Sequence, residues 1–268
     1  MRIVALIPAR LGSSRFPNKP LAPLFGRPMI EHVWYRASAS RLLTDVVVAT
    51  CDAEIRDAVD AFGGRAVMTS HQHERGTDRI AEAAAILGLG EGDIAVNIQG
   101  DEPMLLPSMV DQAVRPLLDD AALPVTNLCA MIESDAEHTD PNEIKVVTNL
   151  SGEALFMSRS PVPSNTRGAP NVPRIKQVCV IAFRAPVLAQ FAGLEQTPLE
   201  RAESIDMMRL IENGVRVRMV PSSVRTFAVD TPDGLRRVEQ AIEQDDSQKR
   251  FLTALLQQVS PRAMVEHV

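Results

Sequence analysis

The stretch IPARLGSSRFPNKPL, residues 7–21, decides how the rest of this sequence is interpreted. It continues from the apolar run RIVALIPA, residues 2–9, which has the length and composition of a buried β-strand. Arg10, Arg15 and Lys19 then lie among glycine, serine and proline residues that favour a loop. A buried strand that leads into a loop with three cations suggests a site for a negatively charged ligand.

Two interpretations of this loop compete. The segment lacks the G-x-G-x-x-G pattern of dinucleotide-binding folds and the G-x-x-x-x-G-K-[ST] pattern of a P-loop. A glycine- and serine-rich loop with arginine and lysine still provides the close backbone approach and positive charge that phosphates need. Arg10 and Arg15 would grip phosphate oxygens as forks, and Lys19 would act as a point charge. The alternative is a solvated surface loop whose cations pair with nearby carboxylates.

Beyond the loop, the first half of the chain alternates β-rich runs with amphipathic stretches of helical spacing. The predicted strands after the first one cover residues 44–50, 65–70 and 93–103. The predicted helices between them cover residues 28–40, 53–62 and 78–88. This order is typical of a Rossmann-like α/β fold, with a mostly parallel sheet flanked by helices. Ligands of such sheets bind beyond the carboxyl ends of the strands, so we favour the phosphate site for the 7–21 loop.

From about residue 123 to residue 183 the pattern changes to that of a smaller mixed or antiparallel lobe. Its predicted strands cover residues 125–132, 144–149, 153–160 and 177–183. The segment 161–173 is rich in proline, serine and asparagine and is predicted to be a loop, which we hypothesise closes over the substrate. Later predicted elements are helices at 186–191 and 199–212, a strand at 215–222 and a helix after residue 231.

We therefore predict a single domain over residues 1–244 and a helical extension over 245–268. The core of the domain would cover about residues 1–122 and 200–244, and the smaller lobe about residues 123–199. One predicted helix face of the extension suggests a packing or dimer contact. That face carries Phe251, Leu252, Leu255 and Leu256.

Composition argues against several classes of function. The 268-residue chain has a formal net charge of -6 and a pI of about 5.5, so we expect no nucleic-acid partner. Its 3 cysteines are far apart and lack C-x-x-C spacing, which argues against a disulfide framework or a zinc site and fits the reducing cytoplasm. There is no signal-peptide pattern and no apolar segment long enough to cross a bilayer, so we expect a cytoplasmic protein without membrane insertion.

Two carboxylates are placed to hold a metal ion. Asp101 follows an apolar strand in VNIQGDEP, residues 96–103, and Asp230 follows a β run in AVDTPDGL, residues 228–235. Carboxylates at this edge of the sheet are the ligands that Mg²⁺ prefers when it bridges phosphates. The structural alternatives are a turn-capping role for Asp101 and a helix N-cap role for Asp230. Without an H-E-x-x-H or G-x-S-x-G motif, the chemistry would depend on positioning and electrostatics.

Six motifs carry a resemblance to a known family: IPAR-x-GSSRFP-x-KPL, G-x-PMI-x-HV, GTDR, NIQGDEP, PN-x-x-KVV and VDTP. In this order they resemble the CMP-KDO synthetases, the 3-deoxy-manno-octulosonate (KDO) cytidylyltransferases, up to about residue 244. The resemblance implies a fold like that of type A nucleotidyltransferases. It implies transfer of CMP from CTP to the anomeric hydroxyl of an acidic sugar, with release of pyrophosphate. It also implies a requirement for Mg²⁺, a homodimer built through the smaller lobe, and a place in lipopolysaccharide biosynthesis.

The resemblance further implies roles for particular residues. The catalytic residues would be Lys19, Arg10, Arg15 and Asp101. The nucleotide would be bound by Arg10, Ser13, Arg15, Lys19, Gly76, Arg79 and Gln99. The metal would be held by Asp101 and Asp230, and the acceptor by Arg159, Gln177 and Asp206. The loop at 7–21 would then cradle the triphosphate of CTP and take up the charge of the leaving group.

The sequence departs from the family in two segments that contact the acceptor sugar. KQVCVIAF, residues 176–183, stands where the family has a segment like RHLGIYGY. Gln177 and Ile181 therefore replace a histidine and a tyrosine. In ERAESIDMMR, residues 200–209, Met207 replaces the glutamine of the family's EHIEMLEQLR.

These replacements make the acceptor pocket more apolar and remove partners for sugar hydroxyls, which changes the acceptor that such a site favours. One interpretation is a cytidylyltransferase for KDO or a KDO-like 2-keto sugar acid. A second is a cytidylyltransferase for another acceptor, such as a modified octulosonate, another acidic sugar or a phosphonate. The remaining alternatives are a non-catalytic nucleotide-binding protein on the same fold and an enzyme that uses another base or a sugar phosphate.

Overall fold

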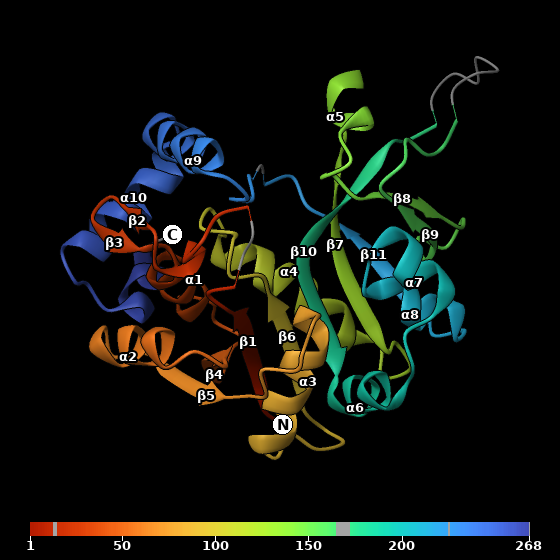
Figure 1. The fold of residues 1–268 in the computed structure, drawn as a ribbon, viewed down its shortest axis with the longest axis horizontal. Helices are drawn as coiled ribbons and strands as arrows, with labels where there is room; N and C mark the ends of the chain where they lie inside the picture. Colours follow the sequence, from red (N-terminus) through yellow and green to blue (C-terminus); the bar gives the residue numbers. More distant parts are fainter. Residues whose placement is uncertain (13–14, 165–171, 225, 268) are drawn as a thin grey trace.

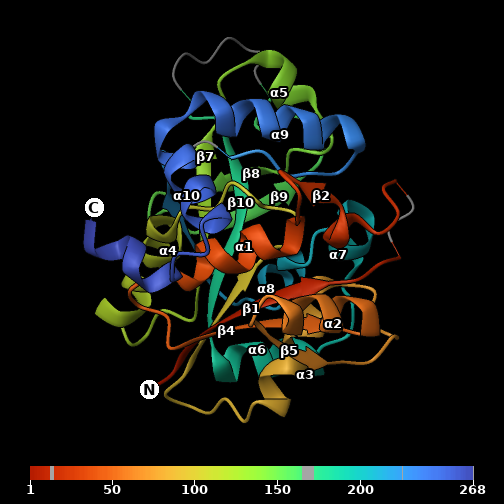
Figure 2. The ribbon, with the colours of Figure 1, turned by 90° about the vertical axis from the view of Figure 1, so that its left-hand side faces the viewer.

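The computed structural model describes residues 1–12, 15–164, 172–224 and 226–267 of the chain. Its centre is a 9-stranded sheet with the order β11-β7-β10-β6-β1-β4-β5, to which β8 and β9 are added through β10. Helices cover the sheet on both sides (Figure 1 and Figure 2). The predicted α/β class, a mostly parallel sheet flanked by helices with a smaller mixed lobe, is confirmed.

The N-terminal half of the sheet is parallel. Its strands are β1 (Ile3–Ala9), β4 (Asp45–Thr50), β5 (Arg65–Met68) and β6 (Ile94–Ile98). The helices of this half are α1 (Met29–Ser38), α2 (Ala53–Ala61), α3 (Gly76–Ile86) and α4 (Pro107–Asp119). The turn η1 (Lys19–Leu21) and the short strands β2 (Pro23–Leu24) and β3 (Arg27–Pro28) precede α1. Because β1 pairs in parallel with both β4 and β6, the carboxyl ends of these strands meet at one edge.

The C-terminal half of the sheet is mixed. Its strands are β7 (Val125–Met131), β8 (Lys145–Thr148), β9 (Ala154–Ser158), β10 (Ile175–Arg184) and β11 (Val217–Pro221). Its helices are α5 (Asp135–Thr139), α6 (Ala185–Gly193), α7 (Pro198–Glu203), α8 (Met207–Glu212), α9 (Pro232–Gln244) and α10 (Asp246–Leu256), followed by the turn η2 (Pro261–His267). β10 runs antiparallel to β6 and to β7, and so joins the two halves into one sheet.

Each face of the sheet carries its own apolar layer. One layer contains side chains from α1, α2 and α4, and the other contains side chains from α3, α6 and α8. All 7 residues of β1 are buried, as expected for a central strand that helices cover on both faces. The loop after β1 therefore starts from a fully buried strand at the centre of the sheet.

Two parts of the helix prediction are wrong. The single helix predicted over 199–212 is two short helices, α7 and α8, because Ser204 adopts a left-handed conformation with a φ of 56°. Sequence analysis also missed α4, whose buried residues recur at helical spacing and pack against β7 and β10. These residues are Met109, Val110, Ala113, Val114 and Leu117.

The C-terminal extension packs onto the core through α1. The Tyr35 hydroxyl donates to the carbonyl oxygen of Val259 at 2.9 Å, and Gln248 Nε2 donates to the carbonyl oxygen of Met104 at 2.9 Å. Figure 2 shows α10 beside α1. Of the predicted apolar face of the extension, Leu255 is buried in the packing, whereas Leu256 has an exposed fraction of 46%, so a dimer contact of this face stays a prediction.

Two further predictions concern loops and membranes. Most of the predicted loop 161–173 lies outside the described residues, since the description stops at 164 and resumes at 172. The hypothesis that this loop closes over the substrate therefore stays a prediction. Within the described ranges, no helix is both long enough and apolar enough to span a membrane.

Candidate active site

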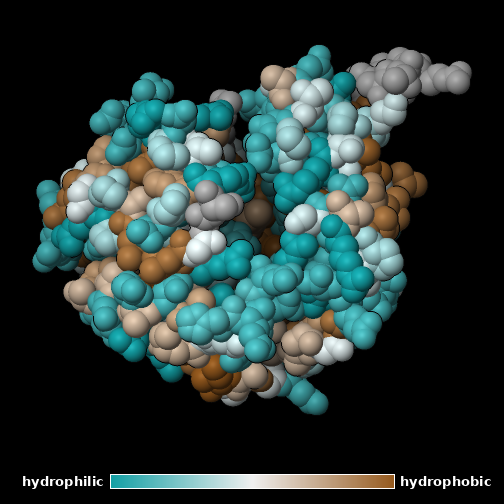
Figure 3. Space-filling view, viewed as in Figure 1, coloured by the Kyte–Doolittle hydropathy of each residue, from teal (hydrophilic) through white to brown (hydrophobic). Residues whose placement is uncertain are grey.

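A cavity of about 350 Å³ lies at the carboxyl edge of β1 and β6. It is lined by the segment after β1, by the turn before α3, by the turn after β6 and by Asp230. Figure 3 shows the molecule hollowed between its two halves in the view of Figure 1. The cavity brings together residues that are more than two hundred positions apart in the sequence, as sheets of this class do at their ligand-binding edge.

Two glycines allow the segments around the cavity to approach one another. A Cβ atom on Gly100 would lie 2.9 Å from the carbonyl oxygen of Pro8, so only glycine fits where β6 ends beside β1. A Cβ atom on Gly76 would lie 3.3 Å from Pro8 Cγ and 3.4 Å from Gln99 Nε2. The backbone N–H of Val229 donates to the carbonyl oxygen of Asp101 at 2.9 Å. This bond places Asp230 beside the turn that carries Asp101.

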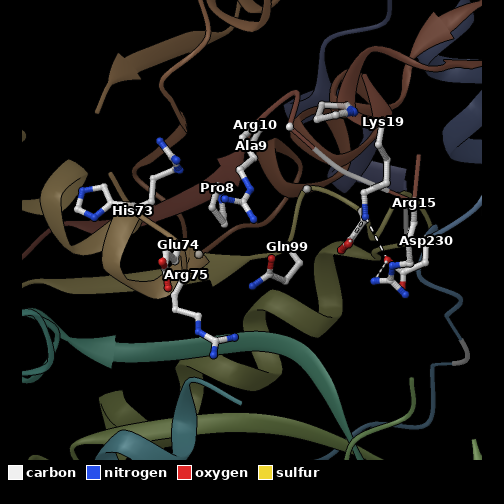
Figure 4. Close-up of a pocket in the computed structure, with 16 residues that line it drawn as sticks. Pro8, Ala9, Arg10, Arg15, Lys19, His73, Glu74, Arg75, Gln99 and Asp230 are labelled. Carbon is white, nitrogen blue, oxygen red and sulfur yellow. Dashed lines mark hydrogen bonds and ion pairs between the residues drawn. The ribbon is translucent and has the colours of Figure 1, made fainter. Parts of the chain in front are cut away.

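Four charged side chains converge at one end of the cavity, and we call them the Lys19 cluster: Arg15, Lys19, Asp101 and Asp230. Lys19 Nζ lies 2.7 Å from Asp101 Oδ2 and 3.3 Å from Asp230 Oδ1. Arg15 Nη2 lies 3.1 Å from Asp230 Oδ1. Figure 4 shows Lys19, Arg15 and Asp230 together on one side of the cavity. The sequence-predicted metal and phosphate residues are thus neighbours in space.

The Lys19 cluster is electrostatically balanced and open to the cavity. Burial alone would lower the pKa of Lys19, but the nearby charges of Asp101 and Asp230 outweigh it and the net shift is upward. The ammonium group therefore stays charged at neutral pH. The side chains of Asp101 and Asp230 are 27% and 34% exposed, so their carboxylates can also meet a ligand in the cavity.

The N-cap alternative for Asp230 is wrong. The residue that caps α9 is Thr231, whose Oγ1 accepts a hydrogen bond from the backbone N–H of Gly234 at 3.1 Å. The capping function is therefore filled by the next residue, and the carboxylate of Asp230 remains directed at Lys19 and Arg15.

The structure adds a residue that sequence analysis quoted in a motif but did not assign. Asn142 Oδ1 accepts a hydrogen bond from Arg15 Nη1 at 3.2 Å. The fully buried ammonium of Lys145 holds this loop in place by donating to the carbonyl oxygens of Asp140 at 2.7 Å and Glu143 at 2.6 Å. These contacts explain the motif PN-x-x-KVV in physical terms: the lysine shapes the loop and the asparagine orients Arg15.

The opposite end of the cavity is formed by the turn before α3. Gly76, Arg79 and Gln99, which the sequence predicted for the nucleotide, all line the cavity. Arg79 is almost fully buried, and its Nη1 donates to Thr69 Oγ1 at 2.6 Å, which leaves part of the guanidinium for the cavity. Figure 4 shows Gln99 between this end and the Lys19 cluster. Arg75, which sequence analysis missed, also lines the cavity.

Two predicted residues of the opening loop remain. Arg10 lines the cavity and is exposed. Its labelled side chain in Figure 4 lies between the Lys19 cluster and His73. Ser13, predicted to bind the nucleotide, lies outside the described residues.

The three residues predicted to bind the acceptor each make contacts within the protein. Arg159 donates to the carbonyl oxygens of Pro141, Glu203 and Ser204 at 2.8–3.2 Å, and so holds the backbone between α7 and α8. Asp206 Oδ2 accepts from the backbone N–H of Thr77 at 3.2 Å, and burial raises its pKa.

Gln177 lies in a different place. It lines a second cavity, of about 500 Å³, that shares Arg15 and Asp230 with the first. Its Nε2 donates to Asn127 Oδ1 at 2.6 Å. The second cavity is also lined by Glu102, which follows Asp101 in the turn after β6. Burial, followed by the charge of Asp101, raises the pKa of Glu102 to about 8.

Comparison with known proteins shows which family has a similar sequence. Residues 4–219 match the sequence profile described as Cytidylyltransferase. The chain is 44% identical to the 3-deoxy-manno-octulosonate cytidylyltransferase of Geobacter metallireducens, over 89% of this chain and 96% of that protein. It is also 44% identical to the enzyme of the same description from Oleidesulfovibrio alaskensis, over 90% of this chain and 96% of that one.

Solved structures agree with these matches. A structure described as CMP:2-keto-3-deoxy-manno-octonic acid synthetase complexed with CTP has a TM-score of 0.84 and 42% identity, over 91% of this chain and 99% of that one. A cytidylyltransferase from Leptospira borgpetersenii has a TM-score of 0.62 at 16% identity, which supports the fold alone. In the relative with CTP, a nucleotide is bound to a protein of the same architecture.

Proposed function

This chain belongs to the cytidylyltransferase family, and from that premise we propose that it transfers CMP from CTP to KDO or a KDO-like 2-keto sugar acid. The observation that carries the proposal is the Lys19 cluster, in which side chains from three distant segments meet at one end of a single cavity. The relative whose structure contains CTP supports a nucleotide in this cavity. The product would feed lipopolysaccharide biosynthesis, as the resemblance implies.

The two ends of the cavity suit the two ends of CTP. The triphosphate would lie against Arg10, Arg15 and Lys19, whose charges suit phosphate oxygens. The cytosine would lie near Gly76 and Gln99, where the backbone can approach closely and an amide can pair with the base.

The reaction breaks one phosphorus–oxygen bond and forms another. The anomeric hydroxyl of the acceptor attacks the α-phosphorus of CTP and loses its proton to solvent. The bond from the α-phosphorus to the bridging oxygen breaks, and pyrophosphate leaves with that electron pair. Lys19 and Arg15 lie where they would stabilise the negative charge on the transferring group and on pyrophosphate. Positioning and electrostatics therefore supply the catalysis, without a covalent intermediate.

The residues present fit a magnesium ion. Asp101 and Asp230 come from distant segments, face the same cation, Lys19 Nζ, and are partly exposed to the cavity. Two carboxylates with open positions for phosphate oxygens are a donor set that Mg²⁺ favours. When bound, Mg²⁺ would neutralise phosphate charge. Asp101 and Asp230 would hold it, while Lys19 would remain paired with whichever oxygens the metal leaves free.

The test is pyrophosphate release by the purified full chain from CTP and Mg²⁺, with and without KDO. We expect release that depends on both KDO and Mg²⁺ and stops when EDTA is added. Parallel reactions with UTP, ATP and GTP test the choice of base. Efficient release from another nucleotide in place of CTP would overturn the cytidylyl part of the proposal.

A second candidate is the same chemistry with a different acceptor. Ile181 and Met207, which stand where the family has tyrosine and glutamine, are buried in the apolar layer on one face of the sheet. Neither side chain can hydrogen-bond to a sugar hydroxyl, so part of the expected recognition of KDO is missing. The panel for this test contains KDO, an amino-substituted KDO, a sialic acid and a simple phosphonate. Release with another acceptor but not with KDO would favour this candidate.

A non-catalytic nucleotide-binding protein is less well supported. A protein that only binds CTP needs cations for the phosphates, but it has no need for two carboxylates placed against Lys19. CTP binding by calorimetry without pyrophosphate release from any acceptor in the panel would favour this alternative.

The homodimer and the cytoplasmic location are also proposals. Leu155 lies on β9, which pairs with β8 alone among the described strands, and its exposed fraction is 56%. An exposed apolar side chain on an edge strand of the smaller lobe supports a dimer contact there. Sedimentation equilibrium tests the dimer, and a monomer at micromolar concentration would contradict it. Use of CTP and the free thiols of the three cysteines support the cytoplasm.

A further inference from the structure

Three side chains of the kinds that bind transition metals meet behind the opening loop. Cys51 follows β4, Asp52 precedes α2, and His71 lies in the turn after β5. Because β4 and β5 are parallel neighbours, with Thr50 opposite Met68, the turns that follow them lie side by side. A sulfur, a carboxylate oxygen and a ring nitrogen of these residues all lie within 4.8 Å of one another. The spacing of Cys51, Asp52 and His71 along the chain is not that of a zinc motif, so no sequence pattern predicts this site.

The donor set selects the kind of metal. A thiolate with an imidazole and a carboxylate suits Zn²⁺ and similar transition metals, whereas Mg²⁺ and Ca²⁺ prefer oxygen alone. The Cys51 thiol donates a hydrogen bond to Asp52 Oδ2, with Sγ and Oδ2 3.7 Å apart. Ordinary Zn–S and Zn–O bond lengths at a tetrahedral angle give a sulfur–oxygen separation of about 3.6 Å. A metal ion could therefore replace the thiol proton between these two atoms with little change in their separation.

The remaining donors are available. His71 is exposed, and no described residue forms a hydrogen bond with its ring, so it can turn toward the other two. Asp52 Oδ2 also accepts the backbone N–H of Leu11 at 2.7 Å, so a metal would take the place of the thiol proton on this oxygen and leave the bond to Leu11 in place. Cys51 is buried, with an exposed fraction of 8%, so a metal would enter from the His71 side.

We propose that Cys51, Asp52 and His71 bind one Zn²⁺ or similar divalent transition-metal ion, with water at the fourth position. Binding releases the thiol proton of Cys51 to solvent. The ion ties the end of β4 to the turn after β5, and Asp52 extends this link to Leu11. The carbonyl oxygen of Leu11 accepts from the backbone N–H of Asn18, next to Lys19, so the metal also anchors the opening loop.

Cobalt titration of the metal-free full chain tests the proposal. Co²⁺ enters zinc sites and reports on them by absorption: a thiolate ligand gives a near-ultraviolet charge-transfer band, and tetrahedral geometry gives intense visible bands. We expect both signals to saturate at one Co²⁺ per chain and to be removed by Zn²⁺. The variant Cys51→Ser should lose the charge-transfer band, and His71→Ala should weaken binding at least tenfold. Cys179→Ser, which removes a thiol outside the proposed site, should bind like the unchanged chain.

Thermal melting gives a second readout. Zn²⁺ at a concentration well above its dissociation constant should raise the melting temperature of the unchanged chain, and the increase should be smaller in His71→Ala. His71 is exposed, so its removal does not threaten the fold. Equal cobalt spectra in His71→Ala and the unchanged chain would overturn the proposal, as would binding that requires millimolar metal. These outcomes do not depend on the acceptor or on catalysis, so the proposed function can fail while this site is upheld.

Discussion

Two clusters in this molecule each centre on one cation that faces two carboxylates, and they differ in how far these side chains are exposed. In the Lys19 cluster, Lys19 is 14% exposed and its partners Asp101 and Asp230 are 27% and 34% exposed. In the second cluster, the Arg209 cluster, Arg209 is 3% exposed and pairs with Glu200, at 0%, and Asp78, at 20%. All four members of the Lys19 cluster line one cavity, whereas Arg209 and Glu200 are buried inside the protein.

The Arg209 cluster is closed by its own contacts. The guanidinium donates to both oxygens of Glu200 at 2.7–2.8 Å and to both oxygens of Asp78 at 2.7 and 3.1 Å. It also stacks over the ring of Phe191 at 3.9 Å. The nearby carboxylates outweigh burial and raise the pKa of Arg209. With its partners already in place, this cluster holds α3, α7 and α8 together and has no capacity left for a ligand.

This difference in exposure separates a structural role of a charge cluster from a functional one. Burial of a charge is costly, so a closed cluster needs every partner to stay intact and contributes to structure. A partly exposed cluster keeps more of its hydration, so its charges cost less free energy to bury. Its side chains can exchange their ion pairs with one another for contacts with phosphate oxygens or a metal. We therefore expect changes in the Lys19 cluster to affect turnover, and changes in the Arg209 cluster to affect stability.

The largest expected effect is that of Asp101→Asn. It keeps the size of the side chain but removes one of the two carboxylates that face Lys19. We expect kcat for pyrophosphate release to fall about 10³-fold, equivalent to about 4 kcal/mol of transition-state stabilisation. The melting temperature should change little. Asp57→Asn, on the exposed surface of α2, is the matched control and should keep full activity. Wild-type turnover by Asp101→Asn would show that the open cluster is not the reaction centre.

The second effect belongs to the closed cluster. Arg209→Met leaves the buried carboxylate of Glu200 without its cation. We expect a loss of about 3 kcal/mol in the free energy of unfolding, measured by urea titration, with kcat of the folded fraction retained. Arg201→Met, on an exposed position of α7, is the control. A stable Arg209→Met variant with strongly reduced kcat would reverse the assignment of the two clusters.

Arg15→Ala tests the edge of the open cluster. The Arg15 side chain is 58% exposed, so its ion pair with Asp230 adds little to stability. Arg15→Ala removes a charge-assisted contact with the bound phosphates. KM for CTP should therefore rise about tenfold, which corresponds to a loss of about 1.4 kcal/mol of binding free energy. Arg15→Lys should recover part of this, because it restores the charge but not the fork. An unchanged KM for both variants would place the triphosphate elsewhere.

The smallest effect concerns His32, a buried titratable group without any carboxylate partner. Burial lowers the pKa of His32 to about 4, although its Nε2 donates to the carbonyl oxygen of Leu24 at 2.8 Å. Protonation at Nδ1, which has no hydrogen-bond partner, would bury an unpaired N–H.

The sign of the resulting pH dependence follows from linkage. The unfolded chain takes up this proton near pH 6.5, whereas the folded chain resists it until about pH 4. Stability is therefore lost as the pH falls through this range. Between pH 7 and pH 5.5 the free energy of unfolding, measured by urea titration, should fall by about 1 kcal/mol more in the unchanged chain than in His32→Gln. If the free energy of unfolding falls equally with pH in the two proteins, the pH dependence does not come from His32.

Much of the nucleotide half could be predicted from local patterns. Strand β1, its loop and the alternation up to β6 follow from runs of apolar residues and from turn residues. The positions of Asp101 and Asp230 after β runs suggested a shared metal site, but no local pattern predicted the contact that brings them together. The contact depends on a backbone hydrogen bond between Val229 and Asp101, and no local pattern predicts such a bond.

The acceptor half was harder to predict for physical reasons. The left-handed backbone at Ser204 divides one predicted helix into two, and serine gives no sign of this in a sequence. Arg159 was predicted to face the acceptor, but backbone carbonyl groups from two loops occupy its guanidinium. Those loops come together only in the tertiary structure. The omission of α4 is different, since its apolar spacing was present in the sequence.

The most direct test of the central claim is transfer of label from CTP that carries ³²P at the α-phosphate. The full chain is incubated with this CTP, Mg²⁺ and each acceptor of the panel in turn, and the products are separated by chromatography. We expect the label to move to a CMP-sugar whose formation requires KDO or a KDO-like acid, and we expect Asp101→Asn to fail to make it. Label that remains in CTP with every acceptor, or appears as CMP alone, would rule out the proposed transfer.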